Sequence, residues 1–420
     1  MDVAGIAIDL DRHTEVLRAL AERDGIACAG FSTACIEMGR PDLALKVPRS
    51  PSEIAGFLKA VLTEAELAKW KRGKTSWELS TARPELRRAI HYPPIVPLIE
   101  LSELDGLRLS FGEPLRFLVS PITGRVHPRY QICGAPTGRS STSKPNIQGA
   151  PRDPRIRGVF RAADGYVLVA SDYNCMELRA AAYFFDDPQL AAVFERGDDP
   201  HKLTASHVAG RPVETITDEE RSKAKNVNFG TIYGIGPASL VEQIWKNYRL
   251  VINMRDAENL LAGFASLYPV MIAHRRDYAS VCQARGRIVI GPDWREGKGR
   301  IVPLDRLPKD QPTTTCAYSY PIQGICADIC MAALTEVDRR LLADKIDARL
   351  VGWIHDELLV ETREAEVDRV KALLQSEMER AFVATFQTAT LNKLIEVKVA
   401  ANWAAVKEKK RAPTAEHQEQ

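Results

Sequence analysis

The chain has 420 residues, of which 45% are hydrophobic and 27% are charged. This length favours two or three folding units and excludes a small disulfide-stapled scaffold. No stretch approaches the roughly 18 consecutive apolar residues of a membrane span, and the N-terminus lacks the pattern of a signal peptide, so we expect a cytoplasmic protein without a membrane partner. Because the formal net charge is only +2, any attraction to nucleic acid must come from local basic clusters.

The eight cysteines show no C-x-x-C spacing, which favours a reducing compartment over a disulfide framework. Cys326 and Cys330 lie four residues apart in an apolar, alanine-rich run. We interpret this pair as one buried helix face rather than as half of a metal site.

The first hundred residues are predicted to be mainly helical. The stretch 9–22 begins with Asp9 and repeats its apolar residues at helical spacing, so we expect a helix capped by that acid. A second helix is expected over 52–68. The basic stretch 69–74, KWKRGK, either grips a phosphate backbone or forms a solvated turn.

The proline-rich stretch 93–97 is expected to end this helical region, with short strands such as 115–119 after it. Residues 188–284 are expected to be largely helical. The segment 286–312 is rich in glycine, proline and charge, and 321–343 returns to a helix.

The C-terminal part is expected to be mixed. Apolar strands are predicted over 349–354 and 358–361, followed by a helix over 364–382 and a strand over 394–400. The charged, apolar-poor tail 407–420 is predicted to be disordered.

A first candidate functional residue is Asp172, which follows an apolar strand predicted over 166–171. Glu177 lies five residues later, at the start of a helix expected over 177–185. A strand end is a rigid mount for a catalytic group. A single acid in this place is nevertheless more often a helix cap or a turn residue, so catalysis needs a partner.

The sequence His355-Asp356-Glu357 supplies that partner, because it lies at the tip of a hairpin between two apolar strands. Acids in such a turn usually only face water. Carboxylates projected from neighbouring strands repel one another unless cations lie between them, and their hard oxygen atoms suit magnesium. A pair of metal ions held in this way is typical of phosphoryl transfer.

A third feature is a helix that begins with a capping box at Thr217. Its residues Arg221, Lys225, Phe229 and Tyr233 recur every four positions and form one stripe, with cations in the first half and aromatic rings in the second. A nucleoside triphosphate has matching parts, since its phosphates attract cations and its base and sugar pack on rings. The alternative is an amphipathic helix with an aromatic core stripe.

Together the three segments resemble the polymerase motifs of family A DNA polymerases. The first motif, D-Y-S-x-x-E-L-R, corresponds to DYNCMELR at 172–179. The second, R-x-x-x-K-x-x-x-F-G-x-x-Y-G, is met at 221–234, and the third, H-D-E, at 355–357. Flanking matches are TGR at 137–139, PNIQ at 145–148, DPH at 199–201 and PIQG at 321–324.

The resemblance implies an α+β right-hand polymerase fold, with a palm built on an antiparallel sheet, helical fingers and a shortened helical thumb. It places the thumb-like region at 1–104, the palm at 105–186 and 337–406, and the fingers at 187–336. From the length of the chain we expect neither a proofreading exonuclease nor a 5′ nuclease domain.

The resemblance also implies the catalytic roles. Asp172 and Asp356 match the two metal-binding aspartates, and Glu357 is a supporting acid beside them. Lys225 matches the residue that neutralises charge or donates a proton at the leaving group. The implied cofactor is Mg²⁺, with two ions that Mn²⁺ can replace.

For the nucleotide, Glu177 matches a steric gate that crowds the 2′ position of a ribonucleotide, with Tyr233 supporting that wall. Phe229 matches the position that packs on the incoming sugar. The implied dNTP contacts are Arg221, Lys225, Phe229, Tyr233, His201 and Glu177.

For DNA, the resemblance implies a set of contacts near the primer terminus, where minor-groove acceptors common to all correct pairs are read without sequence preference. The implied DNA contacts are Arg139, Asn146, Gln148, Gln323 and His355. The expected partners are primer-template DNA and dNTPs, with a separate exonuclease or processivity factor. We expect a monomer in the cytoplasm of a bacterial or phage-infected cell.

Three departures from the family pattern stand out. Asn174 replaces the usual serine of the first motif and is followed by an unusual Cys-Met pair. Thr315 and Ser319 occupy positions where the family commonly has Arg and Asn to hold template and primer. The segment 287–312, which includes Trp294, is rearranged where the family has a compact Gly-Arg-Arg turn.

The sequence therefore predicts a template-directed DNA polymerase that extends a primer 3′-OH, without proofreading, in replication or repair. One alternative is a single-subunit RNA polymerase, against which Glu177 argues. The other is a non-catalytic nucleic-acid-binding or processivity subunit, which the intact acids and triphosphate cations disfavour.

Overall fold

The computed structural model describes residues 1, 3–73, 77–248, 250–309 and 311–407, so the predicted disordered tail lies outside it from residue 408 on. The chain forms two compact units. The N-terminal unit spans Ile8–Gly124, and the main unit combines Met1–Ala7 with the chain from Arg125 onwards. The domain boundary expected between residues 104 and 105 instead falls within a helix.

The N-terminal unit is helical, as the sequence predicts. Asp9 caps its first helix, because the Asp9 Oδ1 accepts a hydrogen bond from the backbone N of Arg12 at 2.9 Å. That helix continues to Glu37, past the expected end at Glu22. The helices are α1 (Leu10–Glu37), α2 (Pro41–Ala44), α3 (Pro51–Val61), α4 (Glu64–Lys69), α5 (Arg83–Arg87), α6 (Ile95–Phe111) and α7 (Pro114–Phe117).

The single helix expected over 52–68 is divided into α3 and α4. Thr63 and Glu66 form a second capping box, in which each side chain bonds the other residue's backbone N, so the chain restarts a helix there. The basic stretch 69–74 ends at Lys74, which lies outside the described residues, so both interpretations of this stretch stay predictions.

The short strands expected after the prolines 93–97 begin only at Arg125, because two helices come first. Pro94 instead precedes the first residue of α6, and Pro97 lies in its first turn, where no backbone N–H is needed. The stretch 115–119 is also not a strand, because its first residues belong to α7, which begins at Pro114. Proline at the start of a helix favours that helix rather than ending one.

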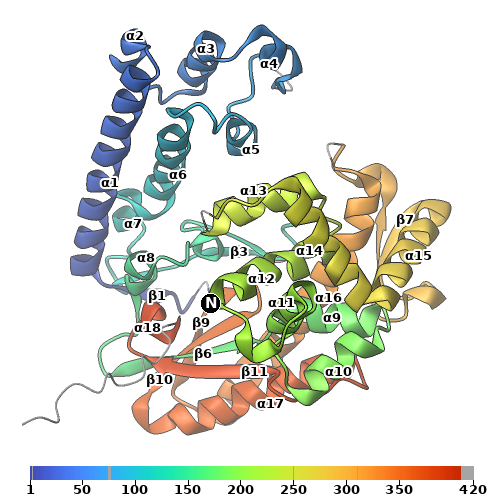
Figure 1. Cartoon of the computed structure of the whole chain (residues 1–420). Helices are drawn as coiled ribbons and strands as arrows, with labels where there is room; N and C mark the ends of the chain where they lie inside the picture. Colours follow the sequence, from blue (N-terminus) through green and yellow to red (C-terminus); the bar gives the residue numbers. More distant parts are fainter. Residues whose placement is uncertain (2, 74–76, 249, 310, 408–420) are drawn as a thin grey trace, which may run out of the picture. The chain divides into compact units, whose positions relative to one another are not determined.

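A four-stranded antiparallel sheet, in the order β11-β6-β10-β9, forms the centre of the main unit. The strands predicted over 166–171, 349–354, 358–361 and 394–400 are all confirmed. Helix α17 (Val367–Thr385) packs against β6, β10 and β11 (Figure 1). The strands are β6 (Tyr166–Tyr173), β9 (Ala348–Ile354), β10 (Glu357–Arg363) and β11 (Ile395–Ala400).

Helices surround this sheet, and 188–284 is largely helical as expected. Helix α16 begins at Thr313 and includes Pro321, so it is longer than the predicted 321–343, and the boundary expected at 336–337 falls inside it. Cys326 and Cys330 are buried on α16, which confirms their interpretation as a core face. The helices are α8 (Pro154–Gly158), α9 (Met176–Phe184), α10 (Pro188–Arg196), α11 (Pro200–Ala209), α12 (Asp218–Ile232), α13 (Pro237–Tyr248), α14 (Met254–Leu267), α15 (Pro269–Arg285), α16 (Thr313–Ala343) and α18 (Trp403–Lys407).

Three small sheets complete the main unit. The segment 286–312 contains a β-hairpin followed by a short 3₁₀ turn rather than an open loop. Within the described ranges, no helix combines the length and apolar character needed to cross a membrane. The remaining strands are β1 (Ile6–Ile8), β2 (Arg125–Val126), β3 (Arg129–Gln131), β4 (Ser141–Ser143), β5 (Phe160–Arg161), β7 (Arg287–Ile290) and β8 (Arg300–Pro303).

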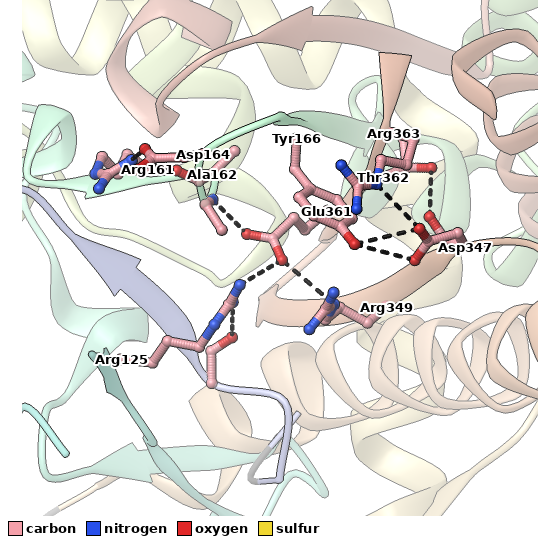
Figure 2. Close-up of polar contacts among 12 residues, drawn as sticks. Arg125, Arg161, Ala162, Asp164, Tyr166, Asp347, Arg349, Glu361, Thr362 and Arg363 are labelled. Carbon is pink, nitrogen blue, oxygen red and sulfur yellow. Dashed lines mark hydrogen bonds and ion pairs between the residues drawn. The ribbon is translucent and has the colours of Figure 1, made fainter. Parts of the chain in front are cut away.

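A buried carboxylate, Glu361 on β10, joins the central sheet to the neighbouring β2-β1-β5 sheet (Figure 2). Its side chain is 0% exposed. The Oε2 atom lies 2.6 Å from Arg125 Nη2 and 3.3 Å from Arg349 Nε, and the Oε1 atom accepts a hydrogen bond from Ala163 N at 2.7 Å. These three partners replace the water that a buried carboxylate loses.

The substitution Glu361→Gln should lower the free energy of unfolding by about 3 kcal/mol, because it leaves the buried Arg125 without its charged partner while keeping the side-chain volume. Chemical denaturation measures this loss. As a control, Lys371→Ala removes an ion pair to Asp368 whose side chains are 43% and 97% exposed, and should cost less than about 1 kcal/mol. Equal losses for the two variants would contradict the importance of the buried network.

Candidate active site

The strand pairing brings the predicted acids together. Asp172 on β6 is directly opposite Glu357 on β10. Asp356 precedes Glu357 in a two-residue turn with His355, whose φ of 59° is in the left-handed region. The backbone N of Tyr173 donates to the carbonyl oxygen of Asp356 at 3.2 Å. Asp172 and Asp356 therefore belong to neighbouring strand ends that are tied by a main-chain hydrogen bond.

The environment of these acids disfavours two negative charges. Burial of the Asp356 carboxyl, and then the nearby charge of Asp172, raise the pKa of Asp356, although part of the residue remains accessible to solvent. Within the described residues, no group of three or more His, Cys, Asp or Glu side chains is arranged to hold a metal ion. The two aspartates are thus a hard-oxygen pair that fits a cation completing its shell with other ligands.

Trp403 and Arg157, which the sequence analysis did not single out, lie next to the acids. Glu357 is buried, and its Oε1 accepts a hydrogen bond from Trp403 Nε1 at 3.4 Å. The guanidinium of Arg157 lies 4.3 Å from the centre of the Trp403 ring, and its charge reaches Glu357 and Asp172. Burial lowers the pKa of Arg157. In the sequence, the one signal is that Trp403 lies three residues beyond the end of the last strand.

The cations of α12 face the same site. The predicted capping box at Thr217 is present, and Arg221 Nε donates to Asp199 Oδ2 at 2.6 Å. In the described part of the chain, Lys225 makes no hydrogen bond or ion pair. Burial, and then the charges of Arg152 and Arg221, lower the pKa of Lys225, and the charge of Asp172 opposes this. Arg152, which the sequence analysis missed, is thus a further cation beside Lys225, and the group attracts an anion.

His201, predicted as a triphosphate contact, is buried and neutral. Burial lowers its pKa to about 4, and Lys225 and Arg221 add to that effect. Asn228 Nδ2 donates to His201 Nδ1 at 3.1 Å, which leaves the ring proton on Nε2. The His201 ring centre lies 5.6 Å from that of Phe229. The Nε2 atom lies 3.8 Å from Cys175 Sγ, so His201 carries no charge and has a single ring N–H that faces Cys175.

Glu177, the predicted gate, is fixed by two neighbours from distant parts of the chain. Its carboxylate forms an ion pair with Arg139. Burial, and then the charge of Glu177, raise the pKa of Tyr233 well above its usual value. The structure thus brings Glu177, Arg139 and Tyr233 together at the start of α9 and the end of α12.

Among the predicted DNA contacts, Gln148 lies near the turn that holds His355, whereas Asn146 has a local structural role. Gln148 Nε2 donates to the carbonyl of Trp353 at 3.1 Å, next to the turn that holds His355. Asn146 instead has a local role, because its Oδ1 accepts from Gly149 N at 3.0 Å and caps a short turn. Gln323 is partly exposed on α16.

The pH dependence of stability should reveal the buried neutral His201. Its folded-state pKa of about 4 lies below the unfolded value of about 6.5, so the unfolded chain binds the extra proton first as the pH falls. His201→Gln lacks this proton uptake. Between pH 6.5 and pH 4, wild-type stability should fall more steeply than that of the variant in parallel urea titrations. Parallel curves would show that the pKa of His201 is not lowered in the folded chain.

Comparison with known proteins places this chain in a family. Residues 45–405 match DNA polymerase family A. DNA polymerase I of Deinococcus radiodurans is 32% identical over 415 residues, which are 96% of this chain and 40% of that protein. DNA polymerase I of Aquifex aeolicus is 33% identical over 381 residues, 91% of this chain and 61% of the relative. The chain thus spans less than two thirds of the length of either relative.

A solved structure has the same fold. It is the POL domain of Pol1 from M. smegmatis, in complex with DNA primer-template and dNTP. The TM-score is 0.76 at 24% sequence identity, over 96% of this chain and 68% of that one. The expected right-hand polymerase fold is therefore confirmed. Since the family match extends over most of the sequence, this chain belongs to DNA polymerase family A.

Proposed function

We propose that this chain is a template-directed DNA polymerase, which adds dNTPs to the 3′-OH of a primer. The observation that carries the proposal is the placement of two mutually repelling carboxylates, Asp172 and Asp356, opposite an anion-attracting group on α12. The charge of Asp172 reaches Lys225 of that group. Such a site accommodates a metal-bound triphosphate, whose negative phosphates would lie between metal ions on the aspartates and the side-chain cations of α12.

Asp172 and Asp356 would hold two Mg²⁺ ions, and Mn²⁺ can use the same oxygen ligands. The fit rests on the hard carboxylate oxygens and on the raised pKa of Asp356, which a nearby cation would reverse. The chemistry that bound ions supply is activation of the attacking hydroxyl and neutralisation of phosphate charge. Magnesium usually takes one or two protein carboxylates and leaves its other positions to water and substrate.

The side chains of this protein then have distinct tasks. Arg221 would exchange its contact with Asp199 for a phosphate oxygen, and Lys225 would bind the phosphates next to the leaving group. The lowered pKa of Lys225 makes its ammonium a better proton donor to the departing pyrophosphate. His201 would add an uncharged Nε2–H donor beside them.

We assign the N-terminal unit to the thumb, the central sheet to the palm and α10 to α15 to the fingers. Arg139, Gln148, Gln323 and His355 would then face the primer terminus. Primer-template DNA and dNTPs are the proposed partners, in line with the complex of the M. smegmatis domain. An exonuclease or processivity factor would act as a separate partner.

Primer extension tests the function directly. With Mg²⁺ and a 5′-labelled primer-template, the wild-type chain should extend the primer with dNTPs, and Asp172→Ala should lose at least about 100-fold in rate because one of the two carboxylate ligands is gone. Asp164→Ala is the matched control, since Asp164 is 94% exposed and lies just before the same strand. A gel shift without extension would favour a non-catalytic binding subunit.

Sugar selectivity tests the gate. Glu177→Ala should raise the use of rNTPs relative to dNTPs by about tenfold or more, because the side chain that would crowd the 2′-OH is removed. Glu177→Gln keeps the volume and should retain most of the selectivity. Single-nucleotide kinetics with each sugar measure the ratio. Equal use of both sugars by the wild type would contradict the gate and favour an RNA polymerase.

A further inference from the structure

Arg300, on the hairpin of β7 and β8, reaches the two segments that carry the predicted DNA contacts Arg139 and Gln323. Arg300 on β8 extends its guanidinium into the space between Gly138 and Gly324. A Cβ atom on Gly324 would come within 2.9 Å of Arg300 Nη2, and one on Gly138, where φ is +91°, would overlap the guanidinium carbon. At Gly138 the left-handed backbone and the guanidinium of Arg300 together require glycine. At Gly324 a side chain would first meet Ile290 Cγ2 at 2.5 Å and the carbonyl oxygen of Thr137 at 2.7 Å, with Arg300 behind them.

The polar contacts of Arg300 join the same two segments. Its Nη1 donates to the carbonyl oxygen of Thr137 at 2.9 Å. Its Nη2 lies 3.3 Å from each carboxylate oxygen of Asp328, which follows Gly324 by one turn of α16. The planar guanidinium thus bridges the loop at 137–139 and helix α16 with a fixed geometry that a lysine ammonium lacks.

Each bridged segment carries a predicted primer-end contact. Arg139 is two residues beyond Thr137, in a tight turn closed by the hydrogen bonds Gly138 N to Ala135 O at 2.8 Å and Ala135 N to Arg139 O at 3.0 Å. Gln323 is the neighbour of Gly324 on α16. Among the described residues, Arg300 makes no hydrogen bond or ion pair with the side chain of Arg139 or Gln323, and its polar contacts instead hold the backbone segments from which they project.

We propose that Arg300 is a positioning residue for the reading of the primer terminus, an inference that rests on the proposed polymerase function. By holding the 137–139 loop against α16, it sets the separation of Arg139 and Gln323. A correct terminal base pair presents its minor-groove acceptors at a fixed spacing, and a mismatch displaces them. Two donors at a fixed separation therefore distinguish the two, whereas two independently mobile donors do not.

The experiment compares extension from a matched primer end with extension from mismatched ends by single-nucleotide kinetics. In Arg300→Ala, the ratio of matched to mismatched kcat/KM should fall by about tenfold, a loss equivalent to one charge-assisted hydrogen bond. Arg300→Lys keeps the charge but not the fork, and should restore only part of the ratio. The control is Arg295→Ala, which removes an arginine of the same segment that pairs with Asp186 at 3.0 Å and should leave the ratio unchanged.

A merely structural role gives a different result. If Arg300 only stabilised the fold, Arg300→Ala would lower the midpoint of thermal unfolding and slow matched and mismatched extension by the same factor, and this outcome would overturn the proposal. A wild-type chain that extends no primer would instead refute the proposed function. If Arg300→Ala does not fold, an unchanged ratio in Arg300→Lys would overturn the proposal equally.

Discussion

The pairing of β6 with β10 forces carboxylates into one place that they would otherwise avoid. Asp172 is opposite Glu357 in the register of these strands, and the turn that precedes Glu357 brings Asp356 to the same strand end. Burial and mutual repulsion then raise the pKa of Asp356, so the site is unfavourable until positive charge arrives. The main-chain hydrogen bonds of four strands hold this arrangement against the repulsion.

The same strand carries a second buried acid, and each of the two acids has arginine nearby. Glu357 and Glu361 are four residues apart on β10 and so lie on one face of the sheet. Arg157, stacked on Trp403, accompanies Glu357 near the site, whereas Arg125 pairs directly with Glu361. The pair of Glu361 with Arg125 ties together two sheets, whereas Glu357 lies opposite Asp172 at the end of β6. One end of β10 is thus tied to a second sheet through Glu361, and the other end carries Glu357 beside the candidate metal-binding acids.

The charge pattern on the facing helix complements these acids. Lys225 has cationic neighbours and makes no ion pair among the described residues, while Arg221 is held by Asp199. His201 is uncharged because burial opposes its protonation. Helix α12 therefore supplies the charges of Arg221 and Lys225, and the neutral His201 of α11 lies beside the ring of Phe229. Elsewhere in the main unit, Arg300 lies between Gly138 and Gly324 and joins the loop at 137–139 to α16.

Sequence alone determined the elements whose physical cause is local. The apolar runs predicted the central strands, the capping box fixed the start of α12, and Asp9 fixed the start of α1. Proline misled the prediction after 93–97, because its effect depends on whether it begins a helix or interrupts one, and that depends on tertiary packing. Motif spacing pointed to Asp172, Asp356 and Lys225. Only the tertiary structure decided which distant residues lie beside them, since the fold brings Arg157, Arg152 and Trp403 to this site and no spacing in the sequence encodes that.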